Sequence, residues 1–254
     1  ANTFEVRLGS GHGGARSMHM GAATMMLAVE EVIGKAKGVA AVLLQAEINE
    51  LSFKNGSFTS GSGNRSVTLK EVTIAARDNS IAPHLEGMGL DTFTKRENAP
   101  FTFPNGCHAA EVEIDPETGS VTLIKYIMVD DYGSLVNPVL TEGQLHGGVA
   151  QGIGQALMEF VSFDENTGQL LSGSLMDYTL PRAAMLPNFE ATLEGAPTEA
   201  NVLGVKGVGQ AGCIAAPQTI VHAVLNALSP LKIIHLDMPL TSQSIWRAIS
   251  ASRA

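Results

Sequence analysis

The stretch Glu111–Val129, EVEIDPETGSVTLIKYIMV, describes a clear β-hairpin. Apolar and charged residues alternate over Glu111–Ile114, as they do in a half-buried strand. Asp115–Gly119 supplies the Asp, Pro and Gly that favour a tight turn, and Ser120–Val129 is rich in β-forming residues. The stretch therefore predicts two antiparallel strands.

Helices and a second hairpin are expected on the C-terminal side of this stretch. An apolar segment spotted with glycine predicts a helix over Thr141–Glu159. Val161–Phe163 and Gln169–Leu171 then flank a turn of the same design as the first. The tail predicts an amphipathic helix over about Ala216–Leu228, a short strand Ile233–Leu236 and a closing helix that begins at Thr241–Ser242.

The first part of the chain predicts a different set of elements. Ala1–Leu8 is typical of a short strand, and the Ala- and Met-rich stretch Met18–Ala46 predicts one long helix or two shorter ones. A small hairpin is expected within Leu51–Val72. A helix should run from Thr68 through Arg77, because its Thr-x-x-Glu start matches a capping box. Residues 79–104, rich in Pro, Gly, Asn and charge, are the best linker candidate.

Alternating hairpins and helices without a regular βαβ repeat predict an α+β fold with mixed sheets, hairpins and packed helices. The linker suggests two parts, residues 1–95 and 96–254. With 254 residues, 44% of them hydrophobic, the chain is long enough to bury a core. Because a strand-like segment starts at once without an initiator Met, we expect a fragment or a processed subunit.

Charge and cysteine content argue against several classes of protein. A net charge of -9 without a Lys/Arg-rich run disfavours nonspecific binding to nucleic acid or to an anionic membrane. Cys107 and Cys213 provide neither a disulfide framework nor the four thiolates of an iron–sulfur cluster, so we expect both to be reduced and buried. With no visible signal peptide or bilayer-spanning apolar run, we expect a cytoplasmic protein, with a periplasmic one as the alternative.

Three glycine-centred segments are the candidate binding sites. In the first, Gly9–Ser17, small residues let backbone N–H groups converge on an anion, and the side chains of Arg16 and Ser17 add donors. The helix that follows would direct its positive end toward the same anion. An ordinary glycine turn explains these residues equally well.

The second and third segments also allow two interpretations each. In Thr141–Gln155, Gln144 lies among glycines, and its amide would be satisfied by a polar heterocyclic ligand. From the residues alone, a glycine-mediated contact between helices is the favoured alternative. Lys206–Gly212 is a tight loop that would project residue 210 into a cavity, or else a plain entry into a helix. No residues stand at the spacing of a metal site, so we expect no metal held by side chains.

Four motifs occur in the order in which they stand in one known family. Gly204–Pro217, GVKGVGQAGCIAAP, resembles the Gly-Val-Lys-Gly-Val-Gly-Glu-Ala-Gly segment of molybdenum hydroxylase large subunits. Asn137–Gly152, Ser174–Arg182 and the turn Gly11–Ser17 resemble further segments of the same proteins. The chain thus resembles the C-terminal part of the molybdopterin-binding large subunit of the xanthine dehydrogenase/aldehyde oxidase family. Its branch is similar to aerobic carbon monoxide dehydrogenase or aldehyde dehydrogenase.

The resemblance implies a cofactor, molybdopterin cytosine dinucleotide with molybdenum, held by all three segments. Its pyrophosphate and pterin would lie in the turn made by His12, Gly13, Gly14, Ala15, Arg16 and Ser17. Gln144 would bond near the dithiolene, and the metal would lie beside Lys206, Gly207, Val208 and Gly209. Residues 1–95 would be a partial first molybdopterin-binding subdomain and 96–254 the second. The implied partners are the rest of the large subunit and subunits that carry iron–sulfur clusters and FAD.

Position 210 departs from the family pattern, because Gln210 stands where the family keeps its catalytic glutamate. An amide is not a useful proton acceptor, and general-base assistance is typically worth about 10²–10⁴-fold. The resemblance implies a subunit of an enzyme that oxidises an aldehyde or N-heterocycle with water-derived oxygen. Such an enzyme would use another base or water, or would turn over weakly. The alternative is a catalytically silent scaffold or assembly subunit.

Overall fold

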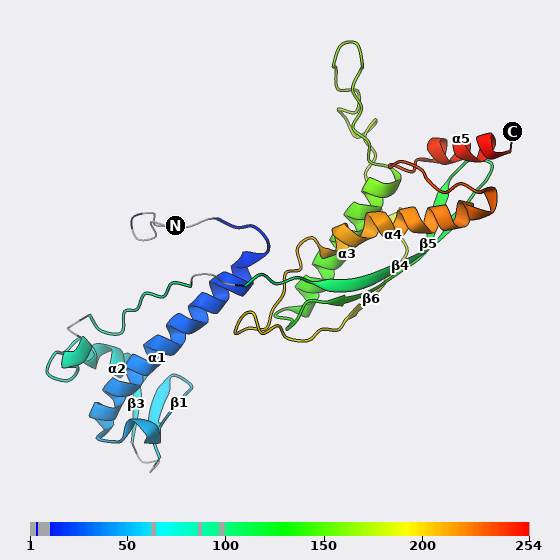
Figure 1. Ribbon diagram of the computed structural model, residues 1–254. Coiled ribbons are helices and arrows are strands. Elements are labelled where there is room, and N and C mark those ends of the chain that lie inside the picture. Colours follow the sequence, from blue (N-terminus) through cyan, green and yellow to red (C-terminus); the bar gives the residue numbers. More distant parts are fainter. Residues whose placement is uncertain (1–3, 5–10, 62–64, 86–87, 97–99, 254) are drawn as a thin grey trace. The chain divides into compact units, whose positions relative to one another are not determined.

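The computed structural model describes residue 4 and the ranges 11–61, 65–85, 88–96 and 100–253. The strand expected over Ala1–Leu8 lies outside these residues, apart from Phe4. The chain divides into two compact units, one made of Met20–Ala99 and the other of Ala1–His19 together with Pro100–Ala254 (Figure 1). The first glycine turn therefore groups with the C-terminal residues rather than with the segment that directly follows it.

The unit Met20–Ala99 contains a long helix and a small sheet. A π-helical turn, Ser17–Ala22, leads into α1, Ala23–Leu44, which continues through Gly34 and Gly38 as one helix. An antiparallel sheet follows, with α2 directly after its last strand. Its elements are β1 (Leu51–Lys54), β2 (Ser57–Ser60), β3 (Ser66–Thr68) and α2 (Leu69–Ala75).

Two sequence predictions for this unit are confirmed. The hairpin turns at Asn55 and Gly56, both with positive φ. At the start of α2, the Thr68 side chain accepts from the Glu71 N–H while the Glu71 carboxylate accepts from the Thr68 N–H, which completes the capping box. Single 3-10 turns complete the local structure here and in the second unit, at Ile48–Glu50, Pro83–Leu85, Ala183–Met185 and Ser229–Leu231.

The second unit is built on the predicted hairpin. β4 (Asn105–Ile114) and β5 (Val121–Asp131) pair antiparallel over more residues than the alternating pattern indicated. β6 (Phe189–Leu193) adds parallel to β5 and makes the sheet mixed, in the order β4-β5-β6. The α+β fold class with mixed sheets is thus confirmed.

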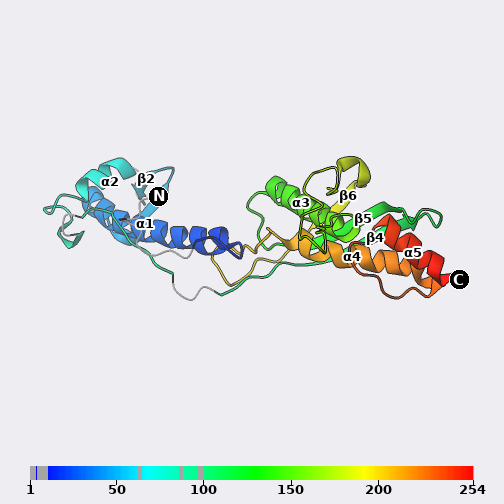
Figure 2. The same ribbon diagram turned by 90° about the horizontal axis from the view of Figure 1, so that it is seen from above.

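Three helices accompany this sheet (Figure 2): α3 (Pro138–Leu157), α4 (Ala211–Leu228) and α5 (Ser242–Ser252). The Asn137 side chain caps α3 by accepting from the Leu140 N–H at 3.1 Å, and Thr241 caps α5 in the same way. The predicted helices are confirmed, although α4 begins at Ala211, earlier than the amphipathic pattern suggested.

Two predictions about this unit are wrong, and one is confirmed in a shorter form. The second hairpin is present as the predicted turn with a single antiparallel bridge between Phe163 and Leu170, at the end of an arm that projects beyond α3 (Figure 1). Ile233–Leu236 forms no strand, because no neighbouring strand pairs with it. Neither cysteine is fully buried, since Cys107 lies on the outer face of β4 and Cys213 is half-buried on α4.

Glycines bring α3 and α4 into backbone contact. A Cβ on Gly212 of α4 would lie 2.6 Å from the Leu145 carbonyl oxygen. On α3, a Cβ on Gly148 would lie 3.0 Å from the Cys213 nitrogen, and one on Gly152 would lie 2.6 Å from the Ala216 Cβ. The glycine-mediated helix contact that the sequence allowed is therefore present.

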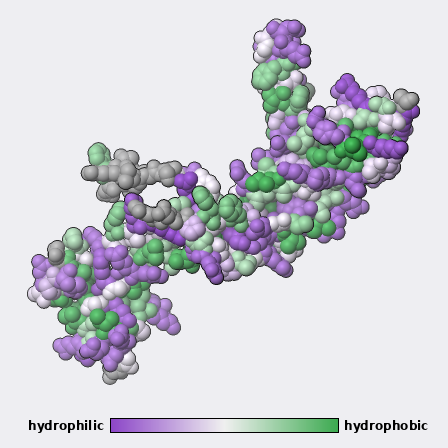
Figure 3. All heavy atoms as spheres, in the orientation of Figure 1, coloured by the Kyte–Doolittle hydropathy of each residue, from purple (hydrophilic) through white to green (hydrophobic). Residues whose placement is uncertain are grey.

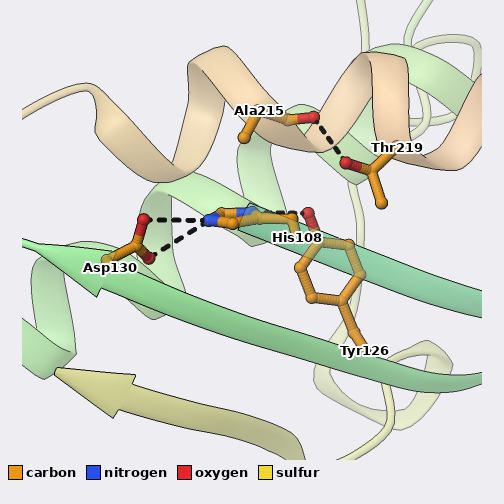
Figure 4. A network of polar contacts seen from close by, with 5 residues as sticks. All are labelled: His108, Tyr126, Asp130, Ala215 and Thr219. Carbon is orange, nitrogen blue, oxygen red and sulfur yellow. Dashed lines mark hydrogen bonds and ion pairs between the residues drawn. The ribbon is translucent and has the colours of Figure 1, made fainter. Parts of the chain in front are cut away.

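A polar network lies inside the core (Figure 4). His108 Nε2 lies 3.1 Å from the Asp130 carboxylate, and its Nδ1 lies 2.9 Å from the Tyr126 hydroxyl. The side chains of His108 and Asp130 are only 2% and 4% exposed. Burial raises the pKa of Tyr126 to about 12, so its hydroxyl stays protonated at neutral pH. The network ties β4 to β5 from within.

Many large apolar side chains remain exposed, and apolar patches interrupt the polar surface (Figure 3). The outer face of β5 carries Ile124, Ile127 and Val129, each more than a third exposed. By length and apolar composition, Ala211–Leu231 is the single described helical segment able to cross a membrane. Core helices meet the same criterion, and Ile220 and Val224 of α4 belong to the core. The absence of a membrane span stays a prediction.

Two glycine substitutions on α3 should change stability in opposite directions. Gly152→Ala places a methyl group against α4 and should lower the free energy of unfolding by on the order of 2 kcal/mol. Gly147→Ala meets no atom within 4 Å and should raise it by up to about 1 kcal/mol through helix propensity. Urea unfolding of the full chain measures both. Equal effects of the two changes would contradict the proposed close contact.

Candidate functional site

The first glycine segment forms a turn with two consecutive left-handed residues. Gly14 and Ala15 have φ of 57° and 55°. The Gly13 carbonyl accepts from the Arg16 N–H and from Arg16 Nε at 2.8 Å, which closes the turn. Ser17 Oγ lies 2.7 Å from His12 Nδ1, so these two exposed side chains hold each other. Tight turns of this kind can direct successive backbone N–H groups toward an anion.

The third segment is fastened to the end of β5. Val205 bridges to Gly133, and the Lys206 N–H donates to the Tyr132 carbonyl at 3.0 Å. The Lys206 ammonium lies 2.5 Å from Asp131 Oδ2. On the other side, the buried Asn201 side chain donates to the Val205 carbonyl at 2.9 Å. The loop therefore starts from a rigid base.

The three segments meet within one unit. The Gln144 amide on α3 donates from Nε2 to the Gly209 carbonyl at 2.7 Å, which joins the second segment to the third. A Cβ on Gly207 would lie 2.8 Å from the Ala15 Cβ, so the third segment touches the first at a point where only glycine fits. Residues separated by more than a hundred positions in the sequence are thus brought to one place.

Beside this junction, α3 presents an open polar face. Gly143 and Gly147 meet no atom within 4 Å where a Cβ would stand, unlike Gly148 and Gly152. Gln144 and Gln151 lie on the same face at helical spacing and are exposed. The glycines of α3 thus fall into two groups: Gly148 and Gly152 admit α4, and Gly143 and Gly147 leave open space beside two amides.

Gln210 lies at the end of the loop, as the N-cap of α4. Its side chain is exposed and makes no capping bond to the helix. Because the Gln210 side chain does not cap α4, its amide can hydrogen-bond another group. The first backbone N–H groups of α4 make this a place where negative charge is stabilised.

An apolar pocket of about 280 Å³ adjoins the same loop. Its walls include Met18, Tyr132, Leu135, Leu140, Val205 and Val208, with Gln144 and Lys206 as polar members. Burial and the nearby Asp130 carboxylate raise the pKa of Tyr132, so its hydroxyl stays neutral. Apolar walls with a few polar groups are typical of small-molecule sites.

The charge of Lys206 is neutralised within the protein. The Lys206 ammonium, and then the Gly133 N–H, hydrogen-bond Asp131 and lower the pKa of its carboxyl. The side chains of Lys206 and Asp131 are 13% and 26% exposed, so water screens the pair only in part. The Lys206 ammonium therefore holds the loop to Asp131. A direct contact between this ammonium and the cofactor stays a prediction.

Sequence reasoning placed the three segments but missed the residues that hold them. Asp131 and Asn201 were not singled out. Asp131 meets Lys206, which is far along the sequence, only after folding, and the local bond from Asn201 to the Val205 carbonyl lies in a loop without a recognisable motif. The signal that was present is the pair Asp130-Asp131 at the end of a predicted strand, where two carboxylates need partners. In the part of the chain that the structure describes, no group of three or more His, Cys, Asp or Glu side chains is placed to hold a metal ion.

Comparison with known proteins gives the family. Residues 1–187 match the molybdopterin cofactor-binding domain. The chain belongs to this family. It is 32% identical over 249 residues to the carbon monoxide dehydrogenase large chain of Hydrogenophaga pseudoflava, covering 98% of this chain and 31% of the relative. The nicotine 6-hydroxylase large subunit of Paenarthrobacter nicotinovorans is 36% identical over 244 residues, which are 94% of this chain and 30% of that subunit.

Solved structures of molybdenum hydroxylases share the fold. A crystal structure of the Cu,Mo-CO dehydrogenase superposes with a TM-score of 0.84 at 29% identity, over 96% of this chain and 31% of the other. Quinoline 2-oxidoreductase from Pseudomonas putida 86 gives a TM-score of 0.80 at 32% identity, over 95% and 31%. This member of the family thus spans less than a third of the length of these proteins, and the resemblance inferred from its four motifs is confirmed.

Asp131→Asn should lower the free energy of unfolding at neutral pH, and the loss should shrink in acid. The folded pKa of Asp131 lies below the unfolded value of about 3.9, so the carboxylate contributes fully above about pH 4. The contribution disappears as the pH falls through the folded pKa. Partial exposure limits it to about 1 kcal/mol. Urea unfolding of the full chain at a series of pH values measures the difference, and a constant gap would rule out a role of the charge.

Proposed function

We propose that this chain is the molybdopterin-binding part of a molybdenum hydroxylase that oxidises an aldehyde or N-heterocycle with oxygen from water. The meeting of the three glycine segments at Gly207 and Gly209 carries the proposal. It supports a single site made of the residues that the family resemblance assigns to the cofactor. The apolar pocket beside Gln144 supports a small organic substrate.

The residues present fit a large anionic cofactor, and we propose its cytosine dinucleotide form. The 12–17 turn offers backbone N–H donors, which suit a pyrophosphate. The open face of α3 around Gly143 and Gly147 leaves room for a flat ring, with the Gln144 and Gln151 amides at its edge. When bound, the cofactor supplies the two-electron oxidation that side chains cannot perform.

The protein's own contribution at position 210 is orientation rather than base catalysis. The Gln210 amide can donate and accept hydrogen bonds but cannot hold a proton at neutral pH. Its neutrality specifically favours the second candidate function, a catalytically silent scaffold or assembly subunit of the same family. The two functions differ in turnover and agree in cofactor binding.

We further propose partners and a compartment. The exposed apolar residues of β5 and α4 support contacts with the rest of a longer large subunit. Two of the relatives are named as a large chain and a large subunit. By analogy, separate subunits would carry iron–sulfur clusters and FAD. We place the complex in the cytoplasm, with the periplasm as the alternative.

Gly14→Val should reduce cofactor content in the assembled complex. A branched side chain is strained at the φ of 57° and would move the turn's backbone donors away from the phosphates. Gly56→Val is the matched control, because Gly56 also has positive φ and open space but lies in the β1–β2 hairpin. Molybdenum and cytidine content of the purified complexes is measured. Equal content in the two variants would contradict the cofactor assignment of the turn.

Gln210→Glu should raise turnover if the complex is a working enzyme. The change is nearly isosteric, and a carboxylate at the start of α4 is stabilised in the charged form that accepts a proton. Single-turnover reduction by a panel of aldehydes and N-heterocycles compares the variant with the parent. A gain of about tenfold or more is expected. Rapid turnover of the parent with a slower variant would place the base elsewhere. Loaded cofactor without turnover in either would support the silent subunit.

A further inference from the structure

We infer that Asp131 is a positioning residue that acts through Lys206 to set the direction of the side chain at position 210. The inference rests on the proposed function, because position 210 matters for chemistry only if the cofactor binds beside it. The position of the loop depends only on residues of this chain, and hydrogen exchange measures it independently of turnover.

The Asp131 carboxylate is itself held on both oxygens. Oδ2 faces the Lys206 ammonium, and Oδ1 accepts from the Gly133 N–H at 2.8 Å. A Cβ on Gly195 would lie 2.3 Å from Oδ1, so only glycine at that position leaves space for the carboxylate. The preceding residue, Asp130, is locked in the core by His108. Apart from the bond to Lys206, these contacts fix the Asp131 carboxylate independently of the 206–210 loop.

Lys206 connects the fixed Asp131 carboxylate to the loop that leads to Gln210. Its backbone N–H donates to the Tyr132 carbonyl and its side chain meets Asp131, so it is attached at two points to the end of β5 and the residue that follows. Between Lys206 and Gln210, two of the three residues are glycines, Gly207 and Gly209, whose backbone has wide conformational freedom. The Gln144 bond to the Gly209 carbonyl restrains only the far end. Without the ion pair, the loop keeps one side-chain tether in place of two.

The role of the pair is geometric. Opposite charges at this distance largely cancel beyond the pair itself, so their field at position 210 is weak. Asp131 also carries two donors already, which leaves it poorly placed to accept a proton from substrate. Fixing the loop is what the arrangement can contribute.

The test compares Asp131→Asn with Glu190→Gln in the assembled complex. Glu190 forms a similar ion pair with Lys125, at 2.9 Å, but the pair is exposed and remote from the loop. Amide hydrogen exchange over residues 206–211 should become about tenfold faster in Asp131→Asn and stay unchanged in the control. Lys206→Met should reproduce the effect, and Lys206→Arg, which keeps the charge, should restore most of the protection. Unchanged exchange, or an increase spread evenly over the core, would overturn the inference.

A second readout connects the loop to chemistry. Any gain in kcat from Gln210→Glu should vanish in the Asp131→Asn background and persist in the Glu190→Gln background, with KM unchanged. A gain of equal size in both backgrounds would overturn the inference even if exchange is faster. A complex without molybdenum would reject the proposed function, while the exchange measurement still decides whether Asp131 fixes the loop.

Discussion

The backbone contact between α3 and α4 is the constraint on which the second unit depends. Three glycines, Gly148, Gly152 and Gly212, let the two helices approach until backbone atoms touch. That approach places the start of α4 against the middle of α3, and so brings Gln210 and Gln144 to the same loop. The site is a consequence of helix packing, since a wider spacing would separate the Gln144 amide from the Gly209 carbonyl.

Elements that depend on neighbouring residues could be predicted from the sequence. Elements that depend on a distant pairing partner could not. The hairpin at Asp115–Gly119 and the capping box at Thr68 are decided by neighbouring residues, and both are present in the structure. β6 was not predicted because its pairing with β5 is parallel and joins segments about sixty residues apart. Ile233–Leu236 has the residues of a strand and lacks a partner, so β propensity alone could not decide it.

The candidate site divides in the same way. Glycine-rich motifs marked the turn, the α3 face and the loop, because such motifs are visible in a linear sequence. The residues that fasten them, Asp131 and Asn201, carry no motif of their own and become meaningful only when their partners are known. The role of each glycine could not be read either, since Gly147 and Gly148 are adjacent and face opposite environments.

The buried network of His108, Asp130 and Tyr126 decides which way β5 faces. Both faces of β5 are apolar, with Leu123 and Met128 inside and Ile127 and Val129 outside, so hydrophobicity alone would tolerate either orientation. Because side chains alternate along a strand, sliding β5 by one residue would expose Tyr126 and Asp130 and leave the His108 ring buried without partners. The hydrogen bonds among the three polar side chains can form in only one register of β5. That register also fixes the position of Asp131 at the end of the strand.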